Sequence, residues 1–186
     1  MFIKKGFEGA RMMEIAEEAG INKALLHYYF RSKEKMFDAV FQQLFSRLFP
    51  ILEKILSRTD ISFFEKIELF SDQYIGFLLE NPFLPNFILN EINSNPGRLS
   101  SLMIKTGTRA NDFIEQVNLE VKKGRIKSID PRQLIINMLS MAIFPIVAKP
   151  IMLKIFFKDD DKEYEKFVEE RRKAVSSFII DAIKNC

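Results

Sequence analysis

The residues best suited to chemistry lie between Asn22 and Lys33, where basic and aromatic side chains occur without any Asp or Glu. Lys23, Arg31 and Lys33 carry the positive charge of this stretch, and His27 and two tyrosines add hydrogen-bonding groups. The segment just before it is rich in glutamate. A basic, acid-free stretch inside a compact region indicates an anionic partner.

Two short helices are expected to position these side chains. The first has apolar residues at the three- and four-residue spacing of one helix face, namely Met12, Ile15, Ala16 and Ala19. Gly20 then permits a left-handed turn, and Asn22 is suited to cap a second helix over residues 23–30. Leu26 and Phe30 are four residues apart, so they share one face of the second helix, which we expect to pack on a core. The basic and tyrosine side chains then lie on the outer face.

Two short helices joined by a tight glycine turn are typical of a helix-turn-helix, whose second helix enters the DNA major groove. Lysine donates to guanine, a small alanine admits a thymine methyl, and tyrosine hydroxyls donate to phosphates. The N-termini of two helices add backbone amides for phosphate. A plain helical hairpin also needs a glycine turn and apolar faces, so it remains an alternative interpretation.

Three segments form an ordered series, residues 5–9 (KGFEG), 15–23 (IAEEAGINK) and 26–34 (LHYYFRSKE). Together they resemble the DNA-binding domain of the TetR family of bacterial transcriptional regulators, and the ordered series over residues 4–37 is specific. A weaker likeness lies at 124–126 (GRI) followed by Asp130-Pro131, which resembles the turn before that family's eighth helix.

The resemblance implies a homodimer whose third helix reads a palindromic operator in double-stranded DNA, and whose helical body binds a small effector that releases the DNA. By position, Lys23 begins the base-reading face and Lys33 lies where the family contacts phosphate. His27 stands where a tyrosine is common, and its alternative role is an exposed imidazole. Ala10 stands where the family usually has a threonine that touches phosphate, and Arg11 is expected to take over that role. The predicted DNA-contacting residues are Arg11, Asn22, Lys23, Ala24, Leu25, His27, Tyr28, Tyr29 and Lys33.

The family has a longer first helix before the turn at Gly6, and this sequence supplies only residues 2–5 of it. We expect that the given sequence omits part of this helix. The alternative is a start that compromises the domain.

Composition narrows the class of protein. Hydrophobic residues make up 47% and charged residues 28%, which is ordinary for a globular protein, and the net charge of +3 permits a nucleic-acid partner without requiring one. The single cysteine, Cys186, allows no disulfide within the chain, so a cytoplasmic protein is expected. The start has no apolar stretch of a signal peptide, and no apolar run reaches the roughly 18 residues of a membrane span.

An enzyme is not expected. The one histidine and the one cysteine lie on distant segments, no Cys/His set has metal-ligand spacing, and no glycine-rich phosphate loop precedes a helix. We therefore predict no catalytic residue, no metal site and no cofactor. A helical small-molecule-binding or protein-interaction module without DNA binding is the alternative function.

The rest of the chain predicts an all-α protein of about eight or nine helices. We expect a helix-turn-helix DNA-binding domain over residues 1–48 and a helical effector-binding and dimerisation domain over 49–186. Pro50 is expected to kink or divide a helix that begins at Lys33. Predicted helix boundaries are Ser62 with Glu65, Asn95-Pro96, Lys122-Lys123-Gly124, Asp130-Pro131 and Asp160 with Glu163.

The stretch from Leu134 to Ala148 is apolar nearly all round, so such a helix must be covered on both sides. The final helix is apolar on one face, and two such helices from each of two subunits would form a four-helix dimer interface. A monomer core is the alternative. The predicted interface residues are Leu134, Met138, Phe167, Arg171, Val175, Phe178 and Ile179.

Nineteen phenylalanines and no tryptophan favour either a phenylalanine-built core or an apolar cavity for a small hydrophobic effector. The residues expected to line such a pocket, each of which is alternatively plain core, are Phe70, Tyr74, Phe77, Phe87, Asn90, Met103, Thr106, Phe113 and Met141.

Overall fold

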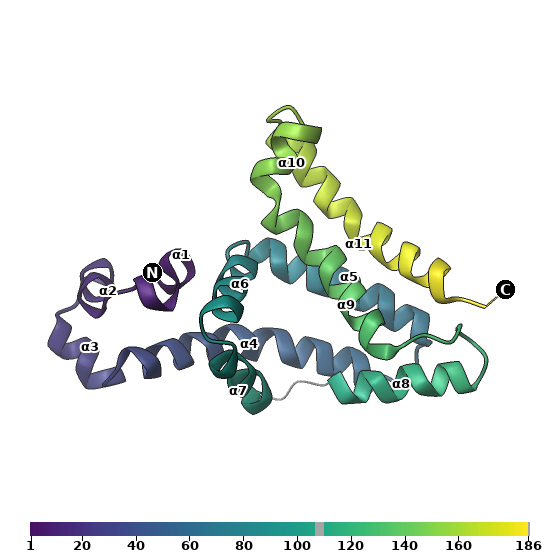
Figure 1. Ribbon diagram of the computed structural model, residues 1–186, viewed down its shortest axis with the longest axis horizontal. Coiled ribbons are helices and arrows are strands. Elements are labelled where there is room, and N and C mark those ends of the chain that lie inside the picture. The colour runs from purple at the N-terminus through teal and green to yellow at the C-terminus, as the bar shows by residue number, and fades with distance from the viewer. Residues whose placement is uncertain (107–109, 186) are drawn as a thin grey trace. The chain divides into compact units, whose positions relative to one another are not determined.

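The computed structural model describes residues 1–106 and 110–185, without the side chains of Ile3, Lys4 and Thr106. Over these residues it forms eleven helices and no strand, which confirms the predicted all-α class (Figure 1). The helices are α1 (Phe2–Gly9), α2 (Met12–Glu18), α3 (Lys23–Phe30), α4 (Lys33–Ser57), α5 (Phe63–Glu80), α6 (Leu84–Ser94), α7 (Pro96–Thr106), α8 (Ala110–Lys122), α9 (Pro131–Val147), α10 (Lys149–Phe156) and α11 (Asp161–Ile183).

The predicted number of helices was too low. Helices α1 and α10 have eight residues each, which is too short for an apolar period to stand out in the sequence. Helix α1 is also bent inside, because Gly6 has φ 67° and ψ −178°, a backbone conformation that is essentially restricted to glycine.

Side-chain caps begin several helices where the sequence predicted them. Ser62 and Glu65 form a reciprocal capping box at α5. The Asp130 carboxylate accepts from the backbone amide of Arg132 at α9, and the Asp160 carboxylate accepts from two amides at α11. Each carboxylate satisfies amides that the helix itself leaves without partners.

Pro50 does not divide α4, which is continuous from Lys33 to Ser57. A proline inside a helix removes one backbone donor and crowds the preceding turn, and neighbouring structure is able to absorb that strain. Of the two outcomes predicted for Pro50, a divided helix was therefore wrong, and a kink stays a prediction.

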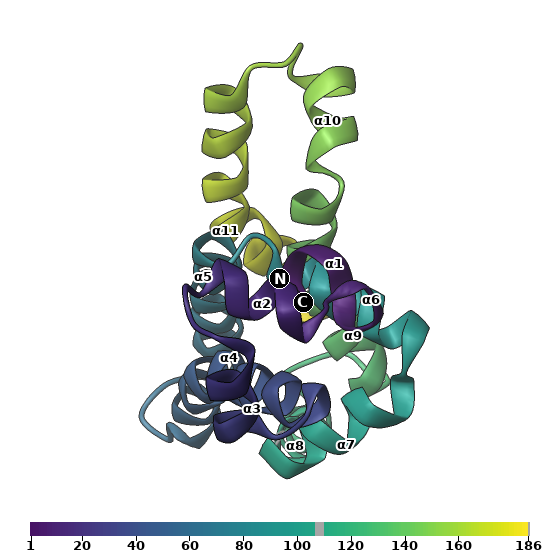
Figure 2. The same cartoon turned by 90° about the vertical axis from the view of Figure 1, so that its left-hand side faces the viewer.

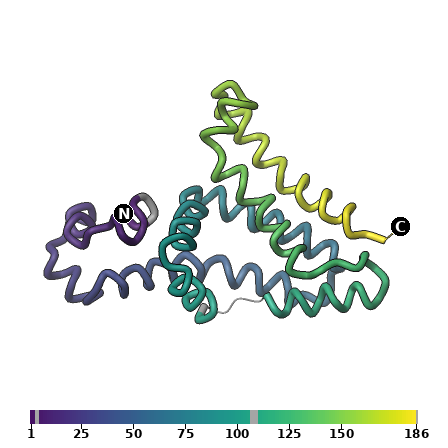
Figure 3. The backbone as a smooth tube through the Cα atoms, viewed as in Figure 1, coloured from purple at the N-terminus to yellow at the C-terminus, as the bar shows by residue number. Residues whose placement is uncertain are grey.

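The chain forms two compact units, residues 1–49 with 83–108 and residues 50–82 with 109–186. In the first unit α1 packs against α6, α2 against α3 and α6 against α7, and the tube in Figure 3 lets the chain be followed through these helices. Its core is aromatic: Phe37 contacts Phe87 with 5.2 Å between ring centroids, and the Phe2 and Phe7 rings meet Phe37 edge-on at 5.3 Å.

In the second unit α5, α9 and α11 pack on one another, and α8 and α10 each contact α9. The fully buried side chains include Ile67, Ile75 and Leu78 of α5, Leu134 of α9 and Val168 of α11. A short connection joins α10 to α11, and Figure 2 shows the two helices as separate columns that this connection links.

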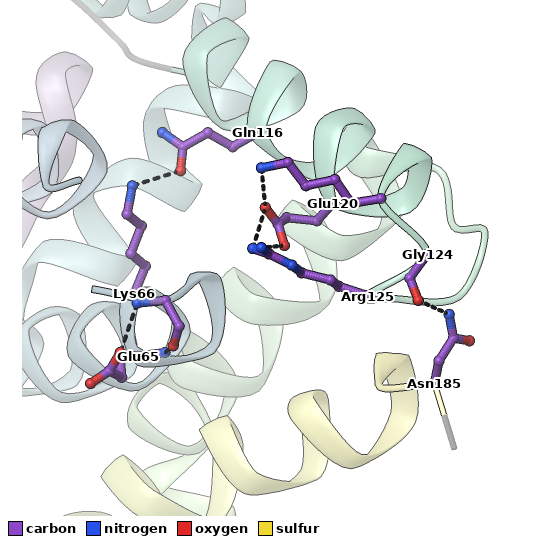
Figure 4. Close-up of polar contacts among 9 residues, drawn as sticks. Glu65, Lys66, Gln116, Glu120, Gly124, Arg125 and Asn185 are labelled. Atoms are coloured by element: carbon purple, nitrogen blue, oxygen red, sulfur yellow. Dashed lines mark hydrogen bonds and ion pairs between the residues drawn. The ribbon is translucent and has the colours of Figure 1, made fainter. Parts of the chain in front are cut away.

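Polar contacts hold the middle of α8 and the turn that follows it in this second unit (Figure 4). Lys66 Nζ donates to the Gln116 side-chain oxygen at 3.0 Å and to the Leu56 carbonyl at 2.8 Å. Past the end of α8, Gly124 has φ 69°, as its predicted place after the helix requires, and its carbonyl accepts from Asn185 Nδ2 at 2.7 Å.

No helix within the described ranges is, by itself, long and apolar enough to cross a membrane; α9 and α10 reach that length and composition only as a pair bent by 73°.

Candidate nucleic-acid interface

The turn between α2 and α3 has the geometry that the sequence predicted. Gly20 has φ 68°, and its amide donates to the Glu17 carbonyl at 3.1 Å. The Ile21 amide then donates to the Ala16 carbonyl at 3.0 Å, and Ala16 is buried. Because a left-handed φ disfavours any residue with a Cβ, the turn depends on glycine at position 20.

Both α3 and α4 begin with a side-chain cap. The Asn22 side-chain oxygen accepts from the Leu25 amide at 2.7 Å, and Ser32 Oγ accepts from the Lys35 amide at 3.2 Å. Between them Arg31 turns the chain with φ 56°. Two helix N-termini, each with a positive dipole end, therefore begin ten residues apart, at Lys23 and Lys33.

Helix α3 buries one of its side chains, Leu26, which is 3% exposed. Phe30 is half-buried, so it contributes less to the core than the spacing suggested. The outer side of α3 carries the predicted DNA-contacting residues in exposed positions, and Tyr28 is 76% and Tyr29 68% exposed. Their rings meet edge-on with 5.5 Å between centroids. The exposed set is Lys23, Ala24, Leu25, His27, Tyr28 and Tyr29.

The charges around this face favour an anion. Among the residues that the structure describes, Arg11, Lys23 and Arg31 take part in no ion pair, and all three are exposed. By contrast, one glutamate of α2 is neutralised by α1, since Lys5 Nζ lies 2.8 Å from the Glu14 carboxylate. The hydrogen bond from Lys5 lowers the pKa of the Glu14 carboxyl below its ordinary value.

Lys33 differs from the other predicted contacts because it is half-buried and already has partners. Its ammonium donates to the Glu8 carbonyl at 3.3 Å and lies 4.5 Å from the centroid of the Phe7 ring. Lys33 is the first residue of α4, and both groups that contact its ammonium belong to α1. Sequence reasoning missed Phe7 and Glu8 as neighbours of Lys33, since no spacing rule joins residues 25 positions apart.

The residues predicted to line an effector pocket are divided between the two units. Phe87, Asn90, Met103 and Thr106 belong to the first unit, and Phe70, Tyr74, Phe77, Phe113 and Met141 belong to the second. The aromatic members are mostly core: Phe70 stacks on Tyr74 at 5.3 Å, Tyr74 is buried, and burial raises the pKa of its hydroxyl. Asn90 is exposed, Met103 and Met141 are half-buried, and the Thr106 side chain lies outside the described residues.

A surface pocket of about 390 Å³ lies elsewhere in the second unit, between the end of α4 and α8. None of the nine predicted residues lines it. Leu56 and Leu119 give it apolar walls, and three carboxylates give it negative charge. The lining residues are Glu53, Leu56, Ser57, Asp112, Glu115, Gln116 and Leu119.

The residues predicted for a dimer interface fall into three groups. Leu134, Met138, Val175 and Ile179 are buried within the chain's own second unit. Phe167 and Arg171 are half-buried, and Arg171 donates to the Met141 carbonyl at 2.7 Å. Phe178 is 63% exposed.

Comparison with known proteins agrees with this geometry. Residues 1–40 match the profile of bacterial regulatory proteins of the tetR family. The HTH-type transcriptional regulator RutR of Escherichia coli is 49% identical over 43 residues, which are 23% of this chain and 20% of RutR. The HTH-type transcriptional repressor NicS of Pseudomonas putida is 39% identical over 46 residues, 25% of this chain and 22% of NicS. The sequence match thus spans about a fifth of the length of these curated relatives.

Solved structures resemble the chain over nearly all of its length. A proposed fatty acid metabolism regulator of Clostridium perfringens has a TM-score of 0.76 at 20% identity, covering 100% of this chain and 95% of that one. The TetR-family regulator PfmR of Thermus thermophilus has a TM-score of 0.64 at 21% identity, covering 95% and 92%. At these identities the likeness establishes the fold.

The geometry and the comparisons together define a helix-turn-helix protein. Residues 1–40 match the profile of the TetR family of bacterial regulatory proteins, and the helical fold of the described residues is one that TetR-family structures share. The predicted resemblance to the family is thereby confirmed.

Proposed function

We propose that this chain is a transcriptional regulator that binds a palindromic operator in double-stranded DNA and acts in the cytoplasm. The observation that carries the proposal is the outer face of α3, where Lys23, His27 and two tyrosines are exposed beside two capped helix N-termini. Lysines and helix N-termini bind phosphates, and side chains on the start of such a helix reach base edges in the major groove.

The first test is binding of the purified protein to the DNA that flanks its own coding region. Fluorescence anisotropy is measured at two salt concentrations, with random DNA as competitor. We expect specific binding that weakens as salt rises, because phosphate contacts release counterions. The variant Tyr28→Ala with Lys33→Ala should lose it, and Lys166→Ala, which removes an exposed charge of α11, should not. The absence of salt-sensitive binding to any duplex DNA would favour the helical module without DNA binding.

We propose that the regulator is a homodimer joined through α9, α10 and α11. In the single chain these helices leave six large apolar side chains more than half exposed, which favours a second copy as their cover. A two-fold dimer would present two copies of α3 roughly 34 Å apart, or a multiple of that distance, to a palindrome. The six side chains are Ile136, Phe144, Ile151, Ile155, Phe156 and Phe178.

Light scattering after size exclusion tests the dimer. Phe178 is in both the predicted interface and the exposed set, so Phe178→Glu should convert a dimer into a monomer without harming the fold. Lys166→Glu on the same helix is the charge control. A wild-type monomer at micromolar concentration would refute the dimer.

We propose further that the regulator represses transcription and that a small hydrophobic effector releases it from DNA. The support is the aromatic content of the helices beyond residue 60, which suits an apolar ligand better than a charged one. Release requires that the effector bind the DNA-free state more tightly than the DNA-bound state. Titration of the operator complex with straight-chain fatty acids and aromatic compounds tests it, and the proposal fails if no compound lowers the anisotropy.

A further inference from the structure

Arg98, near the start of α7, is enclosed by groups from three other helices of the first unit. Its guanidinium lies 3.6 Å from the centroid of the Phe7 ring in α1 and 4.3 Å from that of Phe37 in α4. Its Nη2 donates to the Glu91 carboxylate of α6 at 2.5 Å. The planar guanidinium can lie against aromatic rings and donate to a carboxylate at the same time, which fixes its orientation. A lysine ammonium has no plane and would leave that orientation unfixed.

The Glu91–Arg98 pair is too buried to be an ordinary surface ion pair. The Glu91 side chain is 1% exposed and that of Arg98 14%. Within the described part of the chain, Glu91 Oε1 and Arg98 Nε have no hydrogen-bond partner. Burying two charges with incomplete hydrogen bonding contributes little net stability, so such a pair is better explained by the arrangement that it enforces.

The Phe7 ring connects this pair to the DNA-binding face. Arg98 and Lys33 both lie against it, the Lys33 ammonium at 4.5 Å from its centroid, and Phe37 contacts it edge-on. The Glu8 carbonyl, next along the chain, accepts from Lys33. The Phe7 ring is thus shared by Arg98 and by the Lys33 ammonium beside the capped start of α4.

We propose that Glu91 and Arg98 are positioning residues for DNA binding: they fix Phe7, and through it hold the Lys33 ammonium where a DNA phosphate approaches α4. This inference rests on the proposed function. It assigns to α6 and α7 an indirect part in forming the phosphate site, through Phe7, although neither helix belongs to the helix-turn-helix.

The test uses Arg98→Met and the double variant Glu91→Gln with Arg98→Met, which leaves no buried carboxylate without its cation. For both, we expect operator affinity to fall and the slope of log K against log salt concentration to decrease by about one phosphate contact, as in Lys33→Met. Adding Lys33→Met to the double variant should lower the slope no further. Arg132→Met removes an equally positive but exposed side chain in the second unit and should leave both quantities unchanged.

A second measurement needs no DNA. Acetylation of lysines by a small reagent, read by mass spectrometry, should modify Lys33 more slowly than exposed Lys23 in the wild type. In the double variant Lys33 should react as fast as Lys23, while far-ultraviolet circular dichroism stays helical. If the wild type binds no DNA, the proposed function fails and the acetylation rate alone tests whether the pair positions Lys33. An unchanged Lys33 rate, or an unchanged salt slope in a folded double variant that binds DNA, would overturn the inference.

Discussion

Helices α3 and α5 are about equally apolar in sequence, yet they use their apolar residues in opposite ways. Helix α5 buries seven of its residues, including Ile67, Tyr74 and Leu78. Helix α3 buries Leu26 and leaves two tyrosines and Leu25 exposed. Exposed aromatic side chains on a short, capped helix are costly to solvate, so their presence indicates that α3 is shaped for a partner rather than for the core.

The largest expected effect is a loss of stability when a buried side chain of α5 is shortened. Ile67 is 0% exposed, and Ile67→Ala should lower the free energy of unfolding by about 2–5 kcal/mol, because it removes buried methyl groups and leaves a cavity. Chemical denaturation followed by circular dichroism measures it. Ile104→Ala, at a position 72% exposed and outside the proposed dimer interface, should change stability by less than about 0.5 kcal/mol. Comparable losses at the two positions would contradict the burial described for α5.

The reverse pattern is expected in α3. Tyr28→Ala should leave the unfolding free energy within about 0.5 kcal/mol of wild type, since the side chain is 76% exposed. It should nevertheless weaken operator binding by about 1–3 kcal/mol, or roughly tenfold or more, if the hydroxyl and ring contact DNA. Anisotropy and thermal unfolding on the same preparation separate the two quantities. A variant that is destabilised but binds normally would place Tyr28 in the core instead.

The two helix caps offer a matched comparison. Asn22→Ala and Ser62→Ala each remove a side-chain acceptor from a helix N-terminus, and each should cost about 1 kcal/mol of stability. Only Asn22→Ala should also weaken DNA binding, because it loosens the start of the reading helix. Asn22→Asp, which keeps an acceptor, should restore most of the stability. Equal loss of DNA binding in both alanine variants would show that the effect is general destabilisation.

The smallest expected effect is on the stability of the protein at low pH. The hydrogen bond from Arg132 lowers the pKa of the Asp130 carboxyl from its usual 3.8 to about 2. A depressed pKa means that the folded state favours the carboxylate, so this stabilisation is complete above about pH 4 and decreases as the pH falls toward about 2. The decrease in Tm between about pH 5 and about pH 2 should therefore be slightly smaller in Asp130→Asn than in the wild type. Asp181→Asn, at an exposed position of α11, is the control.

The sequence predicted those features of the fold that depend on interactions between residues close together in the chain. Ser62, Asp130 and Gly124 mark helix ends because each acts on backbone groups within a few residues of itself. The exposed face of α3 could be predicted in the same way, since helical spacing alone separates Leu26 from its exposed neighbours. Pro50 misled because a proline's local penalty does not reveal whether the surrounding packing tolerates it.

Contacts between distant segments were beyond such reasoning. Arg98 and Phe7 are 91 positions apart, and no periodicity marks an arginine that will stack on an aromatic ring. The predicted effector pocket has the same weakness, because apolar spacing does not distinguish a packed core such as that around Tyr74 from a cavity. The pocket between α4 and α8 has carboxylates in its lining, so a pattern of apolar residues in the sequence does not mark it.

The exposed pair on α3 has a spectroscopic consequence. The chain has no tryptophan and four tyrosines, so its intrinsic ultraviolet fluorescence comes chiefly from tyrosine. Tyr74 and Tyr164 are buried in the second unit, whereas Tyr28 and Tyr29 form half of the emitters and lie on the helix proposed to meet DNA. The protein thus contains its own optical reporter: quenching on addition of a duplex would follow the reading helix without any attached dye.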